Sequence, residues 1–321
     1  MSGPASATKP PRIGRGETLG VIAPAGPIRP ASAATLRRGL DRLAATFRIR
    51  LAPSLARSER APDVPSYLSA SDDERAGEFA AMLADPDVRA IVLARGGYGI
   101  TRILSRLDPA ALRRDPKPVV GFSDATALLA WTHACGVRGI HGPMVLQLAD
   151  LPDSDVERLV ALLTDPEPPG IRPWSLAAHG RGRFRGPLVP GNLTMVSMLV
   201  GTPWPLPLAS AIGLFEEVGE KPYELDRYLT QLALTGALAQ VAAVVVGDLT
   251  RCEDPNPPTG VPDPGDAALR AVLERLAAAG TPCAVGAPIG HGARNEAVPF
   301  GADCELDLDR GTLAILEGAV S

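Results

Sequence analysis

The sequence predicts an α/β fold in two parts: a parallel sheet flanked by helices, then a mixed α/β domain. In the first half, short apolar runs alternate with helical periods, the pattern typical of a helix-covered parallel sheet. The proline-rich stretch DPEPPG at 165–170 ends this pattern, and beyond it short apolar runs mix with turns. The chain has 321 residues and 45% hydrophobic content, which is enough for two cores.

The elements expected in the first half follow one another closely. A capping box of Ser71 and Glu74 marks the start of one helix, and Gly136 marks the end of another. The expected strands are 19–23, 91–94 and 119–121, and the expected helices are one with Leu36, Leu40, Leu43 and Phe47 on a single face, one from 71 to Leu83, one at 125–135 and one near 155–163.

Residues 166–170 are the expected linker between an N-terminal domain, 1–165, and a C-terminal domain, 171–321. The second domain shows short apolar runs at 206–208, 212–215 and 241–246 and helices at about 223–235 and 266–279.

Composition excludes several classes of protein. The formal net charge is −4 with no basic block, so no nucleic-acid partner is expected. No apolar stretch reaches the roughly 18 residues of a membrane span, and the first 17 residues show no signal peptide. The four cysteines form no CxxC pair and have no metal spacing, which favours free buried thiols. We expect a soluble, cytoplasmic protein without a metal or cofactor.

Three polar residues in segments that read as strand ends suggest a nucleophile, an acid and a base: Ser123, Glu216 and His291. Ser123 lies between an apolar strand and a helix, where a sharp turn exposes a side chain and aims helix N–H groups at the same place. Asp124 would offer its backbone N–H. The segment reads G-F-S-D-A, without the second glycine of the usual nucleophile elbow, and a plain helix cap is the alternative.

The glycine turn Arg95-Gly96-Gly97-Tyr98-Gly99 follows a predicted buried strand. Adjacent glycines let backbone N–H groups approach a ligand, so the turn could supply a second oxyanion donor or a phosphate cradle. The phosphate reading lacks the GxGxxG and lysine-loop motifs, and an ordinary tight turn remains an alternative.

The residues alone do not choose the acid or the base. Strand alternation puts Glu216 and Glu217 on opposite faces, so that one would face a buried site while the other sees water; a group of exposed charges is the alternative. His291 lies between two glycines beyond a strand, where it would project into a cleft, and His141 is the rival base.

The chain resembles the LD-carboxypeptidase family of serine peptidases from about Thr18 to the C-terminus. Seven motifs carry the resemblance, in the family's order: VIAPAGPI (21–28), ARGGYGITRIL (94–104), VVGFSDATAL (119–128), HGPM (141–144), GNLTMVSMLVGTPW (191–204), LFEEVGEKPYELDRYLTQL (214–232) and GAPIGHGARNEAVPFGA (286–302). The resemblance implies a flavodoxin- or amidotransferase-like sheet, a C-terminal swivelling β/α domain and a homodimer.

The resemblance also implies a Ser123–His291–Glu216 triad and an oxyanion hole of the Gly97 and Asp124 N–H groups. Arg95 and Arg102 are candidates for binding a substrate carboxylate, although either could instead form a structural ion pair. One position departs from the family's Gly-Gly-Asn-Leu: Pro190 precedes Gly191-Asn192-Leu193, removing a backbone donor and fixing φ.

The substrate implied is a muropeptide ending in a D-amino acid, cleaved to release D-Ala, as in peptidoglycan recycling. An alternative within the family is a microcin-immunity-type peptidase that acts on an aminoacyl-nucleotide antibiotic. An alternative of another class is a non-catalytic ligand-binding protein. The turn Pro24-Ala25-Gly26-Pro27 argues against it, because two prolines remove donors that a bound phosphate would need.

Overall fold

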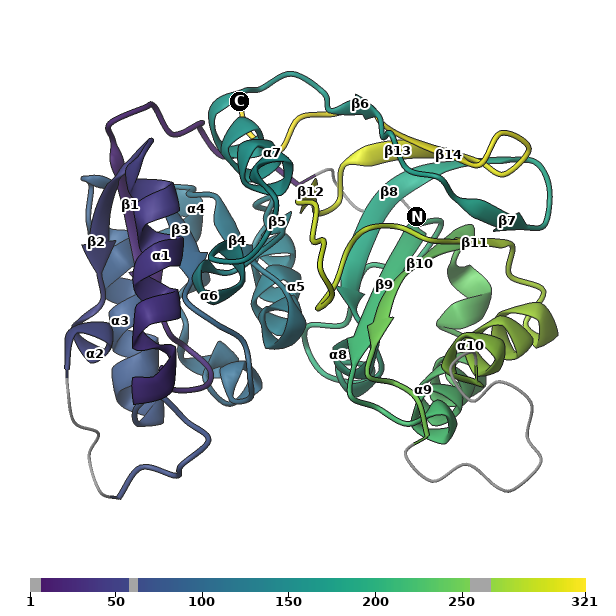
Figure 1. Cartoon of the computed structure of the whole chain (residues 1–321), viewed down its shortest axis with the longest axis horizontal. Coiled ribbons are helices and arrows are strands. Elements are labelled where there is room, and N and C mark those ends of the chain that lie inside the picture. The colour runs from purple at the N-terminus through teal and green to yellow at the C-terminus, as the bar shows by residue number, and fades with distance from the viewer. Residues whose placement is uncertain (1–6, 58–62, 255–266) are drawn as a thin grey trace. The chain divides into compact units, whose positions relative to one another are not determined.

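The computed structural model describes residues 7–57, 63–254 and 267–321. The chain divides into two compact units (Figure 1). The first contains the residues up to Pro168 together with Glu296–Gly301 and Gly318–Ser321; the second contains Pro169–Asn295 and Ala302–Glu317.

The sequence predicts one boundary, at 166–170, whereas two late segments join the first unit. The segment 296–301 does so because β12 pairs with β5, and the C-terminus because Ser321 exchanges backbone hydrogen bonds of 3.0 and 2.9 Å with Arg12 and Pro10.

The first unit contains, within its described residues, a six-stranded sheet in the order β12-β5-β4-β3-β1-β2. All its pairings are parallel except that of β12 with β5. The strands are β1 Thr18–Ile22, β2 Arg48–Leu51, β3 Val88–Leu93, β4 Val119–Gly121, β5 Ile140–His141 and β12 Val298–Pro299, and the α-helices are α1 Ala33–Ala44, α2 Pro53–Ala56, α3 Asp72–Ala84, α4 Pro109–Arg114, α5 Thr126–Ala134, α6 Val145–Leu148 and α7 Asp153–Thr164.

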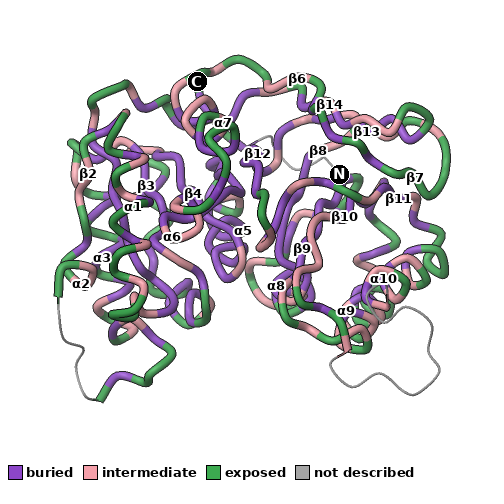
Figure 2. Tube along the Cα trace, viewed as in Figure 1, coloured by how far each residue is buried: buried purple, intermediate pink, exposed green. Residues whose placement is uncertain are grey.

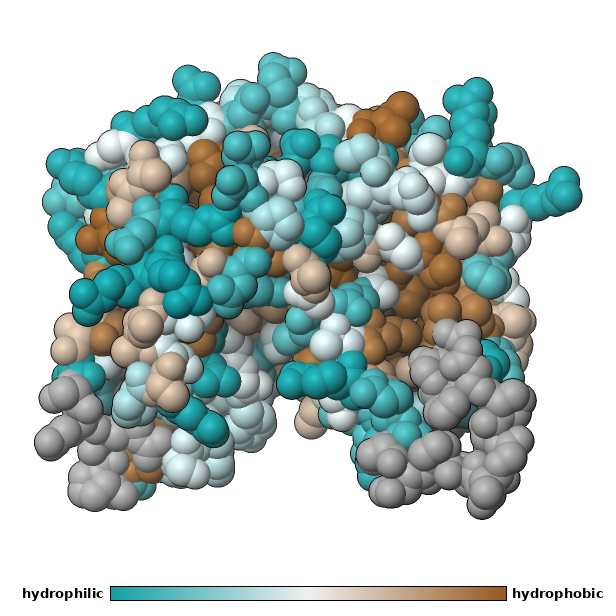
Figure 3. Space-filling model, viewed as in Figure 1, coloured by the Kyte–Doolittle hydropathy of each residue, from teal (hydrophilic) through white to brown (hydrophobic). Residues whose placement is uncertain are grey.

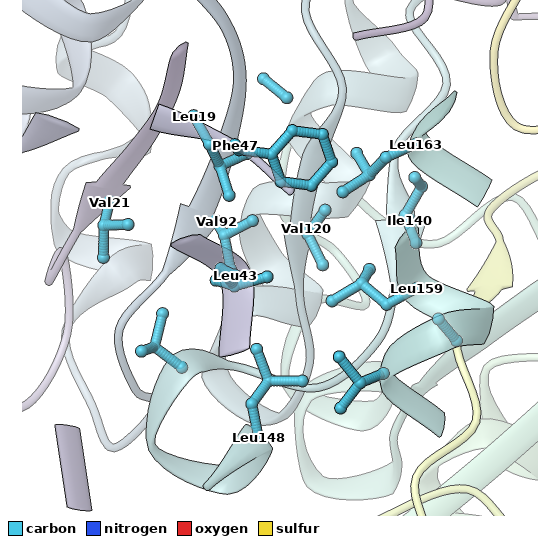
Figure 4. Packing of buried hydrophobic residues seen from close by; sticks show 14 of the residues in the cluster. Leu19, Val21, Leu43, Phe47, Val92, Val120, Ile140, Leu148, Leu159 and Leu163 are labelled. Atoms are coloured by element: carbon cyan, nitrogen blue, oxygen red, sulfur yellow. The ribbon is translucent and has the colours of Figure 1, made fainter. Parts of the chain in front are cut away.

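Helices pack on both faces of this sheet. On one face α1, α6 and α7 bury apolar side chains against β1, β3, β4 and β5 (Figure 4). On the other, Gly20 leaves room for Met82 of α3, and Phe79 of α3 packs edge to face on Trp131 of α5 at 5.9 Å. Figure 2 shows the buried sheet and the exposed outer sides of these helices. Two-sided burial explains why the strands read as continuous apolar runs.

The second unit contains, in its described part, a mixed eight-stranded sheet in the order β6-β14-β13-β8-β9-β10-β11-β7. Strands β8 to β11 run parallel, and α8, α9 and α10 supply leucine and valine side chains that meet β9 and β10. The strands are β6 Gly170–Ile171, β7 Ala177–His179, β8 Arg183–Asn192, β9 Ile212–Val218, β10 Ala243–Thr250, β11 Cys283–Val285, β13 Asp303–Asp307 and β14 Thr312–Ile315, and the helices are α8 Leu193–Met198, α9 Pro222–Leu234 and α10 Ala267–Ala278.

The predicted α/β fold class is confirmed. The capping residue Ser71 accepts a hydrogen bond from Glu74 N, as expected. The run at 206–208 is not a strand, since Pro205 and Pro207 alternate with its leucines and cannot donate to a ladder. Residue 266, the expected start of one helix, lies outside the described residues. The strands that were not predicted are β2, β6, β7, β8, β12, β13 and β14.

Figure 3 shows hydrophilic residues over most of the visible face of the first unit, while hydrophobic residues gather on the second unit around α10. None of the described helices combines the length and hydropathy that a bilayer-spanning helix requires. All four cysteines are buried free thiols, as predicted.

Candidate active site

Ser123 sits in a sharp turn between β4 and α5. The strand ends at Gly121, Phe122 is extended, and Ser123 takes a φ of 61°, in the left-handed region that non-glycine residues rarely adopt. A short 3₁₀ turn, Ser123–Ala125, then leads into α5. This is the strand–turn–helix geometry predicted for Ser123, and the positive φ is the strain expected of a nucleophile elbow.

The turn lacks the second glycine of the elbow, but Gly121 at the end of β4 leaves the room that a tight turn needs. A Cβ on Gly121 would lie 2.7 Å from the Cβ of Ala125, so the turn can close tightly only because residue 121 has no side chain. An alanine two positions after the serine is therefore compatible with the same turn.

The backbone N–H of Asp124 lies in the first helical turn, where N–H groups have no intrahelical partner. Asp124 is 3% exposed, and its side chain accepts a 2.9 Å hydrogen bond from Ile100 N through Oδ2. Burial raises the pKa of Asp124 to about 6, although the bond from Ile100 and the charge of Arg75 oppose the shift. The carboxylate thus ties the serine turn to the glycine turn.

The glycine turn lies against Ser123. A Cβ on Gly96 would come within 3.1 Å of the Cβ and Oγ atoms of Ser123. Gly97 has a φ of 121°, and its N–H has no hydrogen-bond partner among the described residues. Gly99, with a φ of 125°, has no room for a side chain beside Leu68. A small ligand atom beside Ser123 Oγ would therefore lie close to this turn.

The two arginines proposed for carboxylate binding are engaged differently. Arg102 forms an ion pair with Asp72, with distances of 3.0, 3.1 and 3.0 Å, which matches the structural alternative. Arg95 is half-buried and donates to two backbone carbonyls, those of Gly96 at 3.2 Å and Pro27 at 2.9 Å. A role for either in binding substrate stays a prediction.

In the second unit, His291 Nδ1 lies 2.7 Å from Oε2 of Glu216. The Glu216 side chain is fully buried, whereas that of His291 is 20% exposed. A buried carboxylate on Nδ1 orients the ring and leaves Nε2 as its second nitrogen, the arrangement used to hold a general base.

Two glycines make the His291 turn possible. A Cβ on Gly290, whose φ is 139°, would lie 2.8 Å from Asp248 Cβ and 3.2 Å from Glu216 Oε2. A Cβ on Gly247, in the β10 bulge beside Glu216, would lie 2.5 Å from Ile289 O. The ring is brought to Glu216 by backbone packing that tolerates no side chain at either position.

The expectation that one of the paired glutamates is exposed to water is wrong, because both are buried. Glu217 is 2% exposed, because its carboxylate accepts hydrogen bonds from Asn192 Nδ2 at 2.8 Å and from Thr194 N at 2.7 Å. It thus holds the start of α8, and burial raises its pKa. Of the two, Glu216 bonds the histidine.

His141, the rival base, lies in β5 of the first unit and is fully buried, with its ring edge to face with Phe122 at 5.9 Å. Sequence reasoning missed two residues that hold the site. The buried Arg75 side chain donates hydrogen bonds to Gly99 O at 2.9 Å and to Pro24 O. Asn295 Oδ1 accepts from Gly290 N at 3.2 Å. The sequence gives no signal for either residue, because an arginine in a helix and an asparagine in a polar loop are both ordinary.

Comparisons with known proteins identify the family of this chain. The LD-carboxypeptidase N-terminal domain model matches residues 19–142, and the LD-carboxypeptidase C-terminal domain model matches residues 185–306. The murein tetrapeptide carboxypeptidase of Pseudomonas aeruginosa is 32% identical over 258 residues, covering 76% of this chain and 80% of the relative.

Two solved structures share the fold. The muramoyltetrapeptide carboxypeptidase from Oxalobacter formigenes superposes with a TM-score of 0.77 and 26% identity, covering 94% of this chain and 98% of the other. The microcin C7 self-immunity protein MccF in complex with aspartyl sulfamoyl adenosine gives a TM-score of 0.85 at 23% identity, covering 98% and 100%.

The protein is therefore an enzyme, a hydrolase of the serine-type carboxypeptidase class. More narrowly, the chain belongs to the LD-carboxypeptidase family, as the sequence resemblance predicts. Membership supports LD-carboxypeptidase activity in general and argues against the non-catalytic ligand-binding alternative.

Proposed function

We propose that this enzyme hydrolyses the L,D-peptide bond that releases terminal D-Ala from murein tetrapeptides, with Ser123 as nucleophile, His291 as base and Glu216 as orienting acid. The observation that carries the proposal is the 2.7 Å contact of His291 Nδ1 with the fully buried Glu216 carboxylate. The strained turn at Ser123 supports the role of the serine.

In this mechanism Ser123 Oγ attacks the last peptide carbonyl while Nε2 of His291 takes its proton. The carboxylate of Glu216 accepts a hydrogen bond from Nδ1–H, which keeps the ring in the tautomer whose Nε2 is a base, and it stabilises the imidazolium that forms. His291 then protonates the leaving D-amino acid, and water hydrolyses the acyl-enzyme on Ser123 with the same base.

The N–H groups of Gly97 and Asp124 are proposed as the donors that stabilise the oxyanion. Both belong to turns that meet at Ser123, and the Gly97 N–H has no other hydrogen-bond partner among the described residues. Removing one such donor typically slows catalysis by about 100- to 1000-fold. We also expect a homodimer in the cytoplasm, which size-exclusion chromatography and cell fractionation would test.

The second candidate is cleavage of an aminoacyl-nucleotide, favoured by the similarity in fold to MccF. Incubation with murein tetrapeptide, and separately with an aminoacyl sulfamoyl adenosine, separates the two. We expect D-Ala release from the tetrapeptide. Amino-acid release from the nucleotide alone would select the second candidate, and release from neither would overturn both.

An active-site serine probe tests the nucleophile. A fluorophosphonate should label the wild type and fail to label Ser123→Ala. Ser105→Ala changes an exposed serine of the same unit and is the matched control, which should label like the wild type. Labelling that survives Ser123→Ala would place the nucleophile elsewhere.

A further inference from the structure

The carbonyl group of Gly96 is held by two donors. It accepts a 3.1 Å hydrogen bond from Gly26 N and a 3.2 Å hydrogen bond from Nε of Arg95. The same guanidinium donates through Nη1 to Pro27 O at 2.9 Å. Arg95 therefore bridges the glycine turn and the turn that follows β1.

The Gly96 carbonyl and the Gly97 N–H belong to one peptide unit. That unit is planar, and no cis peptide bond occurs among the described residues, so the C=O and the N–H point in opposite directions. Fixing the Gly96 oxygen on Gly26 and Arg95 therefore fixes the direction of the Gly97 N–H on the far side of the same plane.

The backbone of Gly96 and Gly97 would not hold this orientation without further contacts. Gly97 has a φ of 121°, and Gly96 and Gly97 lack the side chains that restrict rotation of the peptide between them. The two turns also touch directly, since a Cβ on Gly97 would lie 3.2 Å from Gly26 Cα and a Cβ on Gly26 would lie 3.0 Å from Gly96 O. The orientation depends on close contact between the turns and on the hydrogen bonds to Gly96 O.

We propose that Arg95 is a positioning residue, which holds the Gly96–Gly97 peptide so that the Gly97 N–H faces the developing oxyanion. The proposal rests on the proposed function of Gly97. It gives the VIAPAGPI motif a role, because that motif supplies Gly26 and Pro27. It also replaces binding of the substrate carboxylate as the role of Arg95.

Separate measurement of kcat and KM distinguishes the two possible roles of Arg95, which are positioning the peptide and binding the substrate carboxylate. Arg95→Met should lower kcat on murein tetrapeptide by about 10- to 100-fold, less than loss of a whole oxyanion donor, because Gly26 N still holds the carbonyl. KM should stay within about twofold. Arg95→Lys should recover part of the loss, since an ammonium can reach one carbonyl but lacks the guanidinium fork.

The matched control is Arg42→Met. Arg42 is a half-buried arginine of the same unit that also donates to backbone carbonyls, those of Leu148 and Leu151, away from the glycine turn. It should leave kcat unchanged. A raised KM with unchanged kcat in Arg95→Met would show that Arg95 binds the substrate carboxylate, and no change in either constant would also overturn the proposal.

A crystal structure of Arg95→Met provides a readout that does not depend on the substrate. The Gly96–Gly97 peptide should show a second orientation or lose order, while the Ser123 turn stays as in the wild type. An unchanged, fully ordered peptide would overturn the positioning role. Absence of D-Ala release by the wild type, with a disturbed peptide in the variant, would instead refute the proposed function alone.

Discussion

Replacing the buried Asp124 by asparagine should change how stability depends on pH. Burial raises the pKa of Asp124 from 3.8 to about 6, so the folded protein keeps a proton that the unfolded chain releases. Stability therefore falls as pH rises from about 4 to about 6, and the full cost of the charged carboxylate, about 3 kcal/mol, is present above that range.

Asparagine is neutral at every pH and can still accept the hydrogen bond from Ile100 N. Any cost of its buried NH₂ group is independent of pH, so the pH-dependent part of the comparison isolates the charge of Asp124. Relative to the wild type, Asp124→Asn should gain about 2 kcal/mol in free energy of unfolding between about pH 4.5 and about pH 7.5.

Urea denaturation at the two pH values measures this gain. Trp131 is the only tryptophan of the first unit in a chain of three, so its fluorescence reports on the unit that holds Asp124 when Trp174 and Trp204 are replaced by phenylalanine in both proteins. A difference between variant and wild type that stays constant within about 0.5 kcal/mol across the two pH values would refute the reasoning.

Three further predictions follow from buried groups. Glu216→Gln should abolish most D-Ala release, whereas Glu217→Gln should retain most activity and cost about 1–3 kcal/mol in unfolding free energy, because a buried acceptor becomes a donor; the reverse order of activities would sink the assignment of the acid. Gly290→Ala should lower both kcat and thermal stability, while Gly280→Ala, also at positive φ but with nothing within 4 Å, should leave kcat unchanged and lose only the roughly 1–2 kcal/mol of a left-handed alanine; equal effects would contradict the steric argument. Arg75→Met should cost about 3–5 kcal/mol, because it leaves the backbone carbonyls of Ala70, Pro24 and Gly99 without their buried donor at about 1–3 kcal/mol each; urea denaturation measures this, and a cost below about 1 kcal/mol would contradict it.

The sequence was most informative where local pattern and tertiary environment coincide. Strand β4 and the helix after it could be predicted because an apolar run, a serine and the start of a helical pattern lie within eight residues of one another. Strand β8 could not, because Pro187 and Pro190 argue against a central strand. The structure resolves this conflict: β8 pairs with β13 only as far as Pro187, so at Pro190 it has β9 as its sole paired neighbour among the described strands.

The contacts around the candidate site were less accessible from sequence. Alternation could separate the faces of Glu216 and Glu217, but it could not show that the second face is buried under the start of α8. Likewise, the sequence suggested either a carboxylate ligand or a structural ion pair for Arg95, and neither includes the backbone carbonyls to which it donates. Its bonds to Gly96 and Pro27 depend on a long-range approach of two loops, which no local pattern encodes.

The φ of 61° at Ser123 has a consequence for choosing an inert variant. A left-handed residue with a side chain costs roughly 1–2 kcal/mol, and glycine there would remove that cost while losing about 0.5–1 kcal/mol in chain entropy. Ser123→Gly should therefore fold at least as well as the wild type, whereas Ser123→Ala keeps the backbone penalty. The hydroxyl is maintained against conformational preference, and the glycine variant is the more robust choice for trapping an uncleaved peptide.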